Sequence, residues 1–332
     1  MKIAINGLGR VGRLFLRAAV QRGVEVALVN EPDGDAEGLA LGVEFDSVQG
    51  RFAHSVRADG DRLQVAGRSI QLLQVEEFEA LPWAEHGVDL VVDCSGRAKR
   101  LERARVHLDR GARQVLVSNP VRGVPNLVYG VNHRACDFTA HPVLTAASCT
   151  TNCLAPVVRV LHDAIGIERG AVTTMHDPTN TQVVVDRPHK DPRRARSALV
   201  NLIPTSTNSA TAVTMIVPEL AGKLDSVAVR VPVLNASLTD CSFQMQRETS
   251  VDEVHEVLRA AAEGPMQGVL GVEDRPLVSS DYANDPRSGV VDALCTRVVD
   301  GRLVKVMIWY DNEWGYANRM VDLTRCIQSA HG

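Results

Sequence analysis

The sequence of 332 residues lacks the features that mark several special classes of protein. No apolar run approaches the ~20 residues that a membrane-spanning helix needs, so we expect no membrane segment. Basic residues are not in excess, since 36 Lys and Arg face 40 Asp and Glu, and this balance argues against a general nucleic-acid-binding protein. Internal repeats, low-complexity segments and flexible linkers are also missing from the sequence. What remains is an ordinary globular protein.

A disulfide framework and a signal peptide are not expected either. The seven cysteines are odd in number and scattered along the chain, which is not the pattern of a disulfide-rich secreted protein. Residues 1–5 run directly into a strand pattern, so we expect no signal peptide before the fold. The reducing cytoplasm is therefore the expected location, and we expect no metal site.

Short apolar segments alternate with helical patterns through the first ~150 residues, about the length of one domain. The segments comprise residues 2–6, 24–29, 88–94 and 114–118. After the first of them, Val11, Leu14, Phe15 and Ala18 recur at helical spacing. Such alternation is typical of a parallel sheet covered by helices on both faces. We therefore predict a Rossmann-type, doubly wound α/β domain that binds a nucleotide.

The second half of the chain predicts a domain of another kind. Its apolar segments are longer and more alternating, and comprise residues 170–176, 225–233, 237–246 and 303–311. Helical patterns follow Ser148, a good N-cap residue, and begin again at Val251. Residues 186–197 are basic and contain two prolines, so we expect them to be irregular. The pattern favours an α+β domain with a mixed or antiparallel sheet.

A G-x-G-x-x-G motif lies between the first predicted strand and the first predicted helix. It comprises Gly7, Gly9, Arg10, Val11 and Gly12. The glycines permit a tight turn and let backbone N–H groups reach a pyrophosphate at the helix N-terminus. Glu31 ends the second strand, where a carboxylate can accept hydrogen bonds from a ribose diol and repel a 2′-phosphate, which favours NAD over NADP. The alternative is a glycine turn without a ligand, followed by a solvated carboxylate.

Cys149 lies at the start of the helix predicted after Ser148. The partial positive charge at a helix N-terminus lowers the pKa of a thiol and enriches the thiolate, which makes Cys149 a candidate nucleophile. Cys153 lies one turn further on the same face. The alternative is that both cysteines are small buried apolar residues, as most unpaired cysteines are.

The stretch Ser148-Cys149-Thr150-Thr151-Asn152-Cys153 resembles the active-site signature of phosphorylating glyceraldehyde-3-phosphate dehydrogenases. The resemblance spans the whole chain, from residues 5–7 to residues 309–316. In that family a cysteine thiolate attacks the aldehyde, the thiohemiacetal passes hydride to NAD, and inorganic phosphate cleaves the resulting thioester. The resemblance therefore implies an NAD-dependent enzyme that acts on glyceraldehyde 3-phosphate as a cytoplasmic homotetramer. It implies an NAD-binding domain over residues 1–148, a catalytic domain over 149–312, and a C-terminal helix over 313–332 that packs back on the NAD-binding domain.

The resemblance also assigns roles to single residues. It implies that Cys149 is the nucleophile and that His176 is the base, a histidine that nothing else in the sequence selects. The remaining implied contacts are, for the phosphate of the substrate, Thr179, Thr181 and Arg230; for inorganic phosphate, Ser148, Thr150, Thr207 and Asn208; and for NAD, the glycine motif, Glu31, Ser118 and Asn312.

Some positions leave this assignment open. Arg194 or Arg196 would add positive charge to the anion sites, the alternative being a solvated or subunit-interface loop. Four residues depart from the usual family pattern, namely Glu31 for Asp, Glu76 for Arg, Ala146 for Asn and Asn208 for Gly. None of these departures removes a catalytic group, but Asn208 changes the expected shape of the inorganic phosphate site.

Several interpretations of function compete within and outside this family. Residues 177–182, 234–241 and 285–288 resemble the members associated with arsenate resistance, in which arsenate takes the place of phosphate and gives 1-arseno-3-phosphoglycerate. A housekeeping glycolytic enzyme is the second interpretation. An erythrose-4-phosphate dehydrogenase is the third, although such enzymes generally lose the threonine that matches Thr179. A non-catalytic binding protein on the same fold is the alternative from another class, and intact Cys149 and His176 weigh against it.

Overall fold

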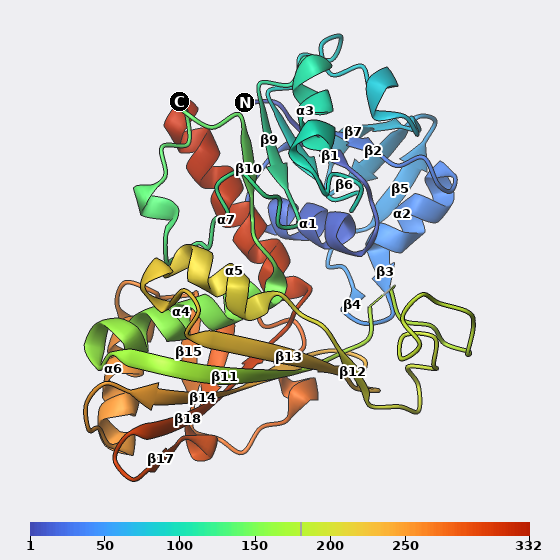
Figure 1. Cartoon of the computed structure of the whole chain (residues 1–332). Coiled ribbons are helices and arrows are strands. Elements are labelled where there is room, and N and C mark those ends of the chain that lie inside the picture. The colour runs from blue at the N-terminus through green and yellow to red at the C-terminus, as the bar shows by residue number, and fades with distance from the viewer. Residues whose placement is uncertain (180) are drawn as a thin grey trace. The chain divides into compact units, whose positions relative to one another are not determined.

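The computed structural model describes residues 1–179 and 181–332 (Figure 1). They form two compact units, of which the first comprises Met1–Ser148 with Ala317–Gly332 and the second comprises Cys149–Tyr316. Helix α7 (Trp314–His331) begins in the second unit and continues into the first. Within the first unit it is held by an ion pair between Arg22 and Asp322 and by a 3.1 Å contact of His331 with Gln114.

The first unit is built on an eight-stranded sheet of described residues, in the order β10-β9-β8-β1-β2-β7-β6-β5. Its strands are β1 (Ile3–Asn6), β2 (Val26–Asn30), β5 (Val56–Asp59), β6 (Arg62–Val65), β7 (Arg68–Leu73), β8 (Leu90–Asp93), β9 (Gln114–Val117) and β10 (Val143–Thr145). The strands from β10 to β7 pair in parallel, whereas β7, β6 and β5 form an antiparallel meander. The predicted Rossmann-type fold is confirmed.

The central strands of this sheet are buried along their whole length. Every residue of β1, β8 and β9 is buried, as the continuous apolar segments predict for parallel strands covered on both faces. The helices of the unit are α1 (Arg10–Gln21), α2 (Ala36–Glu44) and α3 (Leu101–Asp109). Leu14, Phe15 and Ala18 of α1 are fully buried, so the predicted apolar stripe is the face that packs. Shorter elements are β3 (Phe45–Asp46), β4 (Gly50–Arg51) and 3₁₀ turns at Phe78–Ala80 and His133–Ala135.

The second unit contains a mixed sheet in the order β12-β13-β11-β14-β18-β16-β15, with β17 paired to β18. Its strands are β11 (Ile167–His176), β12 (Ile203–Thr205), β13 (Leu224–Arg230), β14 (Ser237–Met245), β15 (Leu270–Glu273), β16 (Gly289–Asp292), β17 (Arg297–Val299) and β18 (Leu303–Tyr310). Strand β11 runs parallel to β13 on one side and antiparallel to β14 on the other. The mixed sheet confirms the predicted α+β architecture.

Helices cover one face of the second sheet. They are α4 (Cys149–Ala164), α5 (Ser209–Ile216) and α6 (Val251–Glu263), with 3₁₀ turns at Pro218–Leu220, Ser279–Tyr282 and Ala293–Cys295. Helix α4 contacts β16 and β18, α5 contacts β13, and α4 also packs against α5, so α4 and α5 form one layer on the same side of the sheet (Figure 1). Residues along β14 alternate between buried and half-buried, which is the pattern of a sheet with one covered face.

Two further observations concern the described chain as a whole. Residues 181–202 form no helix or strand, apart from an isolated bridge between Val183 and Ser197, in agreement with the irregular stretch predicted there. Among the described helices, none combines the length and the apolar character that crossing a membrane requires.

Candidate active site

The glycine motif forms an open turn at the carboxyl end of β1. Gly7 has φ of +95°, and a Cβ placed there would lie 2.6 Å from the Cα of Ser95. A Cβ on Gly12 would lie 1.9 Å from the carbonyl oxygen of Gly7. At Gly9, by contrast, a Cβ would meet no described atom within 4 Å. Two glycines are therefore required for the close packing of strand and helix, and the third leaves the backbone open to a ligand.

Glu31 is tied to this turn by its side chain. Its Oε2 accepts a hydrogen bond from the backbone N–H of Leu8 at 2.7 Å, and Oε1 accepts one from Asp33 at 3.1 Å. Each carboxylate oxygen can accept a second bond, so Glu31 retains acceptor capacity toward a diol. Arg10 and Val11 open helix α1, where Arg10 pairs with Asp46. Ser118 follows β9, and its N–H donates to the carbonyl of Asp93 at 2.9 Å, which places it at the same carboxyl edge of the sheet.

A buried polar network, which the sequence motifs did not indicate, supports this edge. Trp83 Nε1 donates to His107 Nδ1 at 3.0 Å, and His107 Nε2 contacts Asp93 Oδ2 at 2.9 Å. Because an indole N–H can only donate, Nδ1 accepts and the proton of the neutral imidazole sits on Nε2. Asp93 also accepts hydrogen bonds from Asn6 Nδ2 at 2.8 Å and Ser95 Oγ at 2.8 Å. This carboxylate thereby holds β1 and the turn after β8 together beneath the glycine motif.

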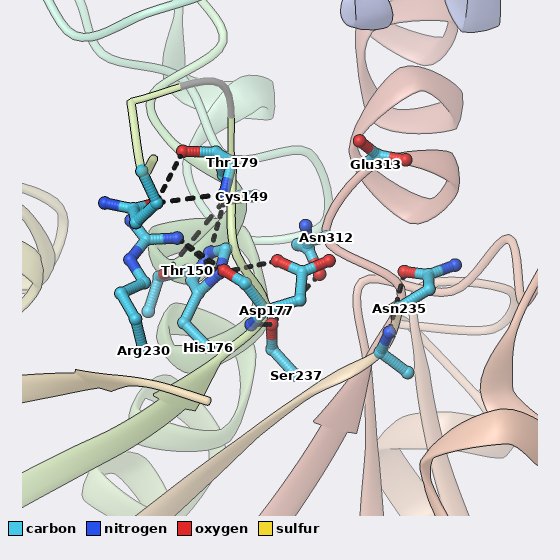
Figure 2. Close-up of polar contacts among 12 residues, drawn as sticks. Cys149, Thr150, His176, Asp177, Thr179, Arg230, Asn235, Ser237, Asn312 and Glu313 are labelled. Atoms are coloured by element: carbon cyan, nitrogen blue, oxygen red, sulfur yellow. Dashed lines mark hydrogen bonds and ion pairs between the residues drawn. The ribbon is translucent and has the colours of Figure 1, made fainter. Parts of the chain in front are cut away.

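Cys149 is the first residue of α4, and its sulfur faces His176. The distance from Cys149 Sγ to His176 Nε2 is 3.7 Å, and Thr150 Oγ1 lies 3.9 Å from the same sulfur (Figure 2). Ala147 precedes this turn with φ of +54°, a left-handed conformation that costs a non-glycine residue roughly 1–2 kcal/mol. Burial disfavours the thiolate, but the hydrogen bond and the charge of His176 outweigh it, and the pKa of Cys149 is lowered.

Cys149 is unlike the other cysteines of the chain, all of which lie within the described residues. Burial raises the pKa of each of the other six thiols, which are Cys94, Cys136, Cys153, Cys241, Cys295 and Cys326. Thiolate reactivity is controlled by pKa, so this difference makes Cys149 the candidate nucleophile among the seven cysteines.

His176 is the last residue of β11 and is buried. Its Nδ1 lies 2.9 Å from the carbonyl oxygen of Asp177 and 2.8 Å from the carboxylate Oδ1 of the same residue (Figure 2). Burial disfavours the charged imidazole, but the contacts with Asp177 and with the Cys149 sulfur outweigh it and raise the pKa of His176 to about 9. Both shifts favour the thiolate–imidazolium pair over the neutral thiol and imidazole.

Arg230 reaches the same imidazole because of the strand register. Strands β11 and β13 pair in parallel so that His176 lies opposite Arg230. Arg230 Nη1 donates to the carbonyl of Asp177 at 2.7 Å and lies 2.8 Å from His176 Nδ1. Its Nε has no hydrogen-bond partner among the described residues. A mostly buried guanidinium with an unused donor is suited to binding an anion.

The other residues predicted for the substrate phosphate lie in the segment that follows His176. Thr179 and Thr181 share a 3.0 Å contact between their hydroxyls. Asn180, which lies between them in the motif of residues 177–182, is outside the described residues. Arg194 donates from Nε and Nη2 to Thr205 Oγ1 at 2.8 and 2.5 Å, and its charge acts on Arg230. Arg196 is instead exposed and paired with Asp186, so of the two arginines Arg194 is the one near the site.

The residues predicted for inorganic phosphate are only partly brought together. Thr150 adjoins Cys149, and its hydroxyl lies 3.0 Å from the hydroxyl of Tyr310. The hydrogen bonds described for Thr207 and Asn208 stay at the N-terminus of α5, where Thr207 Oγ1 contacts Ser209 Oγ at 2.6 Å. Ser148 precedes Cys149 directly.

Asn312 is oriented by Ser237. The hydroxyl of Ser237 donates to Asn312 Oδ1 at 2.9 Å, and the N–H of Asp177 donates to Ser237 Oγ at 3.3 Å (Figure 2). Because Oδ1 of Asn312 accepts from Ser237, the amide Nδ2 is the end of this side chain that can donate to another group. Asp311 anchors this turn by accepting from Asn235 Nδ2 at 2.9 Å and from the N–H of Trp314 at 2.8 Å.

Three residues of this site were missed by the sequence analysis as functional candidates, namely Asp177, Ser237 and Tyr310. Tyr310 lies on the buried side of strand β18, whose residues alternate between buried and half-buried. The sequence could therefore have predicted which face of the sheet Tyr310 occupies, but not that it contacts Thr150. Asp177 follows His176 directly, and a carboxylate next to a candidate base is a signal that the sequence contains. The described residues include no group of three or more His, Cys, Asp or Glu that could hold a metal ion.

Comparison with known proteins gives consistent matches over the whole chain. Residues 1–101 match the model of the glyceraldehyde 3-phosphate dehydrogenase NAD binding domain, and residues 148–312 match the model of the C-terminal domain. Glyceraldehyde-3-phosphate dehydrogenase 3 of Nostoc sp. is 51% identical, with 98% of each chain covered. The glyceraldehyde-3-phosphate dehydrogenases of Geobacillus stearothermophilus and Zymomonas mobilis are each 46% identical, with at least 97% of each chain covered.

Proposed function

Since the chain belongs to the glyceraldehyde-3-phosphate dehydrogenase family and NAD is its cofactor, we propose that Cys149 and His176 oxidise glyceraldehyde 3-phosphate through a thioester. The observation that carries this proposal is the 3.7 Å contact of Cys149 Sγ with His176 Nε2, beside the guanidinium of Arg230. The pKa of the thiol is lowered and that of the imidazole is raised, as a nucleophile and its acid–base partner require.

The residues of the first unit fit a dinucleotide. The turn is open at Gly9, the N-terminus of α1 favours a pyrophosphate, and Glu31 lies beside the turn to accept a ribose diol. Bound NAD supplies the acceptor for the hydride. We propose that residues 1–148 are the NAD-binding domain, 149–312 the catalytic domain and 313–332 the C-terminal helix of the first domain, and that Asn312 and Ser118 contact the nicotinamide end.

The chain's own groups account for the proton movements of the reaction. The thiolate of Cys149 adds to the aldehyde carbon, and the imidazolium of His176 protonates the resulting oxyanion. His176, now neutral, takes the same proton back as hydride leaves the carbon, and the thioester forms. Inorganic phosphate then attacks the thioester carbonyl, which releases the acyl phosphate and restores the Cys149 thiolate beside the imidazolium.

The anion requirement tests the reaction type. NAD reduction is measured with glyceraldehyde 3-phosphate and with erythrose 4-phosphate, each with and without added inorganic phosphate. Strict dependence on added phosphate with the triose is the result expected of a phosphorylating enzyme. Turnover of the tetrose without added phosphate would instead identify an erythrose-4-phosphate dehydrogenase, and no NAD reduction with either sugar would contradict the proposal.

We predict that Arg230→Ala weakens recognition of the substrate phosphate. Charge-assisted hydrogen bonds contribute about 1.5–3 kcal/mol, so the preference for glyceraldehyde 3-phosphate over glyceraldehyde is expected to fall about 10- to 100-fold in kcat/KM. Taking the ratio of the two substrates cancels any effect that Arg230 exerts through His176. Arg196→Ala is the matched control, because Arg196 is 63% exposed and paired with Asp186. An unchanged ratio in Arg230→Ala would remove Arg230 from the phosphate site.

Within the family, we propose arsenate detoxification as the physiological role, with arsenate taking the place of phosphate to give 1-arseno-3-phosphoglycerate. Support comes from the motifs at residues 177–182, 234–241 and 285–288, and a housekeeping role in glycolysis is equally compatible with the family. Turnover with arsenate does not separate the two roles, because the anions are similar. Deletion of the gene does: arsenate sensitivity without loss of glycolytic growth supports the detoxification role, and unchanged sensitivity contradicts it.

We also propose that the protein is a cytoplasmic homotetramer. The irregular segment 181–202 carries apolar side chains that are mostly exposed in the single chain, among them Val184, Val185, Leu199, Val200 and Leu202. Large exposed apolar groups gathered on one segment are typical of a surface that another subunit covers. Light scattering on the purified protein tests the homotetramer, and a monomeric mass would contradict it.

A further inference from the structure

The carboxylate of Asp177 lies next to His176, but the reaction steps described above give it no role. It is buried, with only 3% of its side chain exposed, and its Oδ1 lies 2.8 Å from His176 Nδ1. The other ring nitrogen of His176, Nε2, faces the Cys149 sulfur at 3.7 Å. The imidazole thus stands between a sulfur on one side and a carboxylate on the other (Figure 2).

The neighbours of Nδ1 decide where the protons of His176 lie. The carbonyl oxygen of Asp177, at 2.9 Å, and its Oδ1 can only accept. Arg230 Nη1, at 2.8 Å from the same nitrogen, can only donate and so opposes a proton on Nδ1. The two oxygens of Asp177 favour a proton on Nδ1, and a thiolate on the opposite side accepts from Nε2 when that nitrogen is protonated as well. Both nitrogens of His176 then donate, which is the imidazolium form.

The charges around the imidazole show what a carboxylate does at this place. Arg230 on β13 brings Nη1 to 2.8 Å from His176 Nδ1, and two cations at this distance repel each other in a buried site. Asp177 lies against both, since its carbonyl accepts from Arg230 at 2.7 Å and its carboxylate contacts Nδ1. With the Cys149 thiolate, the four charges balance.

We propose that Asp177 is a positioning residue that completes a Cys149–His176–Asp177 triad, its carboxylate holding the imidazole protonated and directed at the sulfur. This proposal rests on the function proposed above, because it explains how His176, the acid–base group of that reaction, keeps its proton. Asp177 acts through His176 and touches no reacting atom itself.

The groups that face His176 from each neighbouring element determine the expected pH dependence. Helix α4 contributes Cys149, β13 contributes Arg230, and β18 contributes Tyr310, whose ring lies 6.1 Å from the imidazole, edge to face. Burial raises the pKa of Tyr310 well above its ordinary value, so this hydroxyl stays neutral. Cys149 and Asp177 therefore raise the pKa of His176, whereas burial and Arg230 lower it. Removing the Asp177 charge should shift the loss of the imidazolium proton to lower pH.

The experiment compares wild type with Asp177→Asn, an uncharged variant of the same size. Cys149 of the protein without cofactor is alkylated from pH 5 to 10 with iodoacetamide, which is neutral, and in parallel with iodoacetate, which is an anion. The rate with iodoacetamide depends on the fraction of Cys149 that is thiolate. The rate with iodoacetate depends on the same fraction and also on the positive charge of the neighbouring imidazolium. The ratio of the iodoacetate rate to the iodoacetamide rate therefore falls at the pH at which His176 loses its proton. The midpoint is expected near pH 9 in wild type and lower by about one unit or more in Asp177→Asn.

The alkaline limb of kcat/KM for NAD reduction should move in the same direction by the same amount. Asp225→Asn is the matched control, because it removes an exposed carboxylate from β13, the strand that carries Arg230, and should leave the midpoint unchanged. An unchanged midpoint and alkaline limb in Asp177→Asn would overturn the triad. So would a wild-type midpoint at the ordinary histidine value near 6.5, a measurement that does not depend on the folding of any variant. Failure of wild type to reduce NAD with glyceraldehyde 3-phosphate would instead contradict the proposed function, which the alkylation ratio does not test.

Discussion

Replacing Cys149 with serine is expected to lower kcat for NAD reduction by at least ~10⁴-fold while the dissociation constant for NAD stays nearly unchanged. A serine hydroxyl beside an imidazole is a far weaker nucleophile than a thiolate. His176 lowers the pKa of the Cys149 thiol, but it cannot ionise a serine hydroxyl to the same extent. Steady-state rates and calorimetric titration of NAD measure the two quantities separately.

Cys153→Ser is the matched control for this variant. Cys153 lies one turn further along α4, it is fully buried, and burial raises the pKa of its thiol. It should retain most of the activity. An equal loss in both variants, or a loss of NAD binding in Cys149→Ser, would show that Cys149 is a structural residue and not the nucleophile.

The second large effect is expected from His176→Asn, which should lower kcat about 10²- to 10⁴-fold, the usual contribution of a general acid–base. The variant should also slow alkylation of Cys149 by iodoacetamide at pH 7. Burial disfavours the thiolate, and the hydrogen bond and charge of His176 are what lower the pKa of Cys149. Without them the pKa rises, so the rate of alkylation should reach its plateau only at higher pH.

His54→Asn is the control for this substitution, since His54 is exposed and lies in the first unit. The pH profile of alkylation separates two explanations of a slow His176→Asn variant. A profile shifted to higher pH supports the ion pair between Cys149 and His176. A slow reaction with an unshifted profile would contradict it and would leave His176 with a role in proton transfer only.

Features that depend only on residues close together in the sequence were predictable from it. The glycine motif, the helix that begins at Cys149 and the alternation of β14 all follow from backbone preferences and from which face of an element is apolar. These local patterns were sufficient for the two fold classes. They were not sufficient for the antiparallel strands β5, β6 and β7 at the edge of the first sheet, which the sequence analysis did not predict.

The partners in the site depend on contacts between residues that are far apart in the sequence. His176 was selected only by resemblance to a family, because a histidine at the end of an apolar strand is usually structural. Arg230 meets it across 54 residues through the parallel register of β11 and β13, and Tyr310 meets Thr150 across 160 residues. Alternation along a strand tells which face a side chain takes, but not which strand lies beside it.

The sequence by itself determined that this chain has a dinucleotide-binding fold, a cysteine at a helix start and a second domain with a mixed sheet, because each is written in local residue patterns. The tertiary structure alone decided that a carboxylate, a guanidinium and a sulfur converge on one imidazole. Charges interact through space and not along the chain, so the protonation state of His176 is set by the groups that packing brings to its two nitrogens.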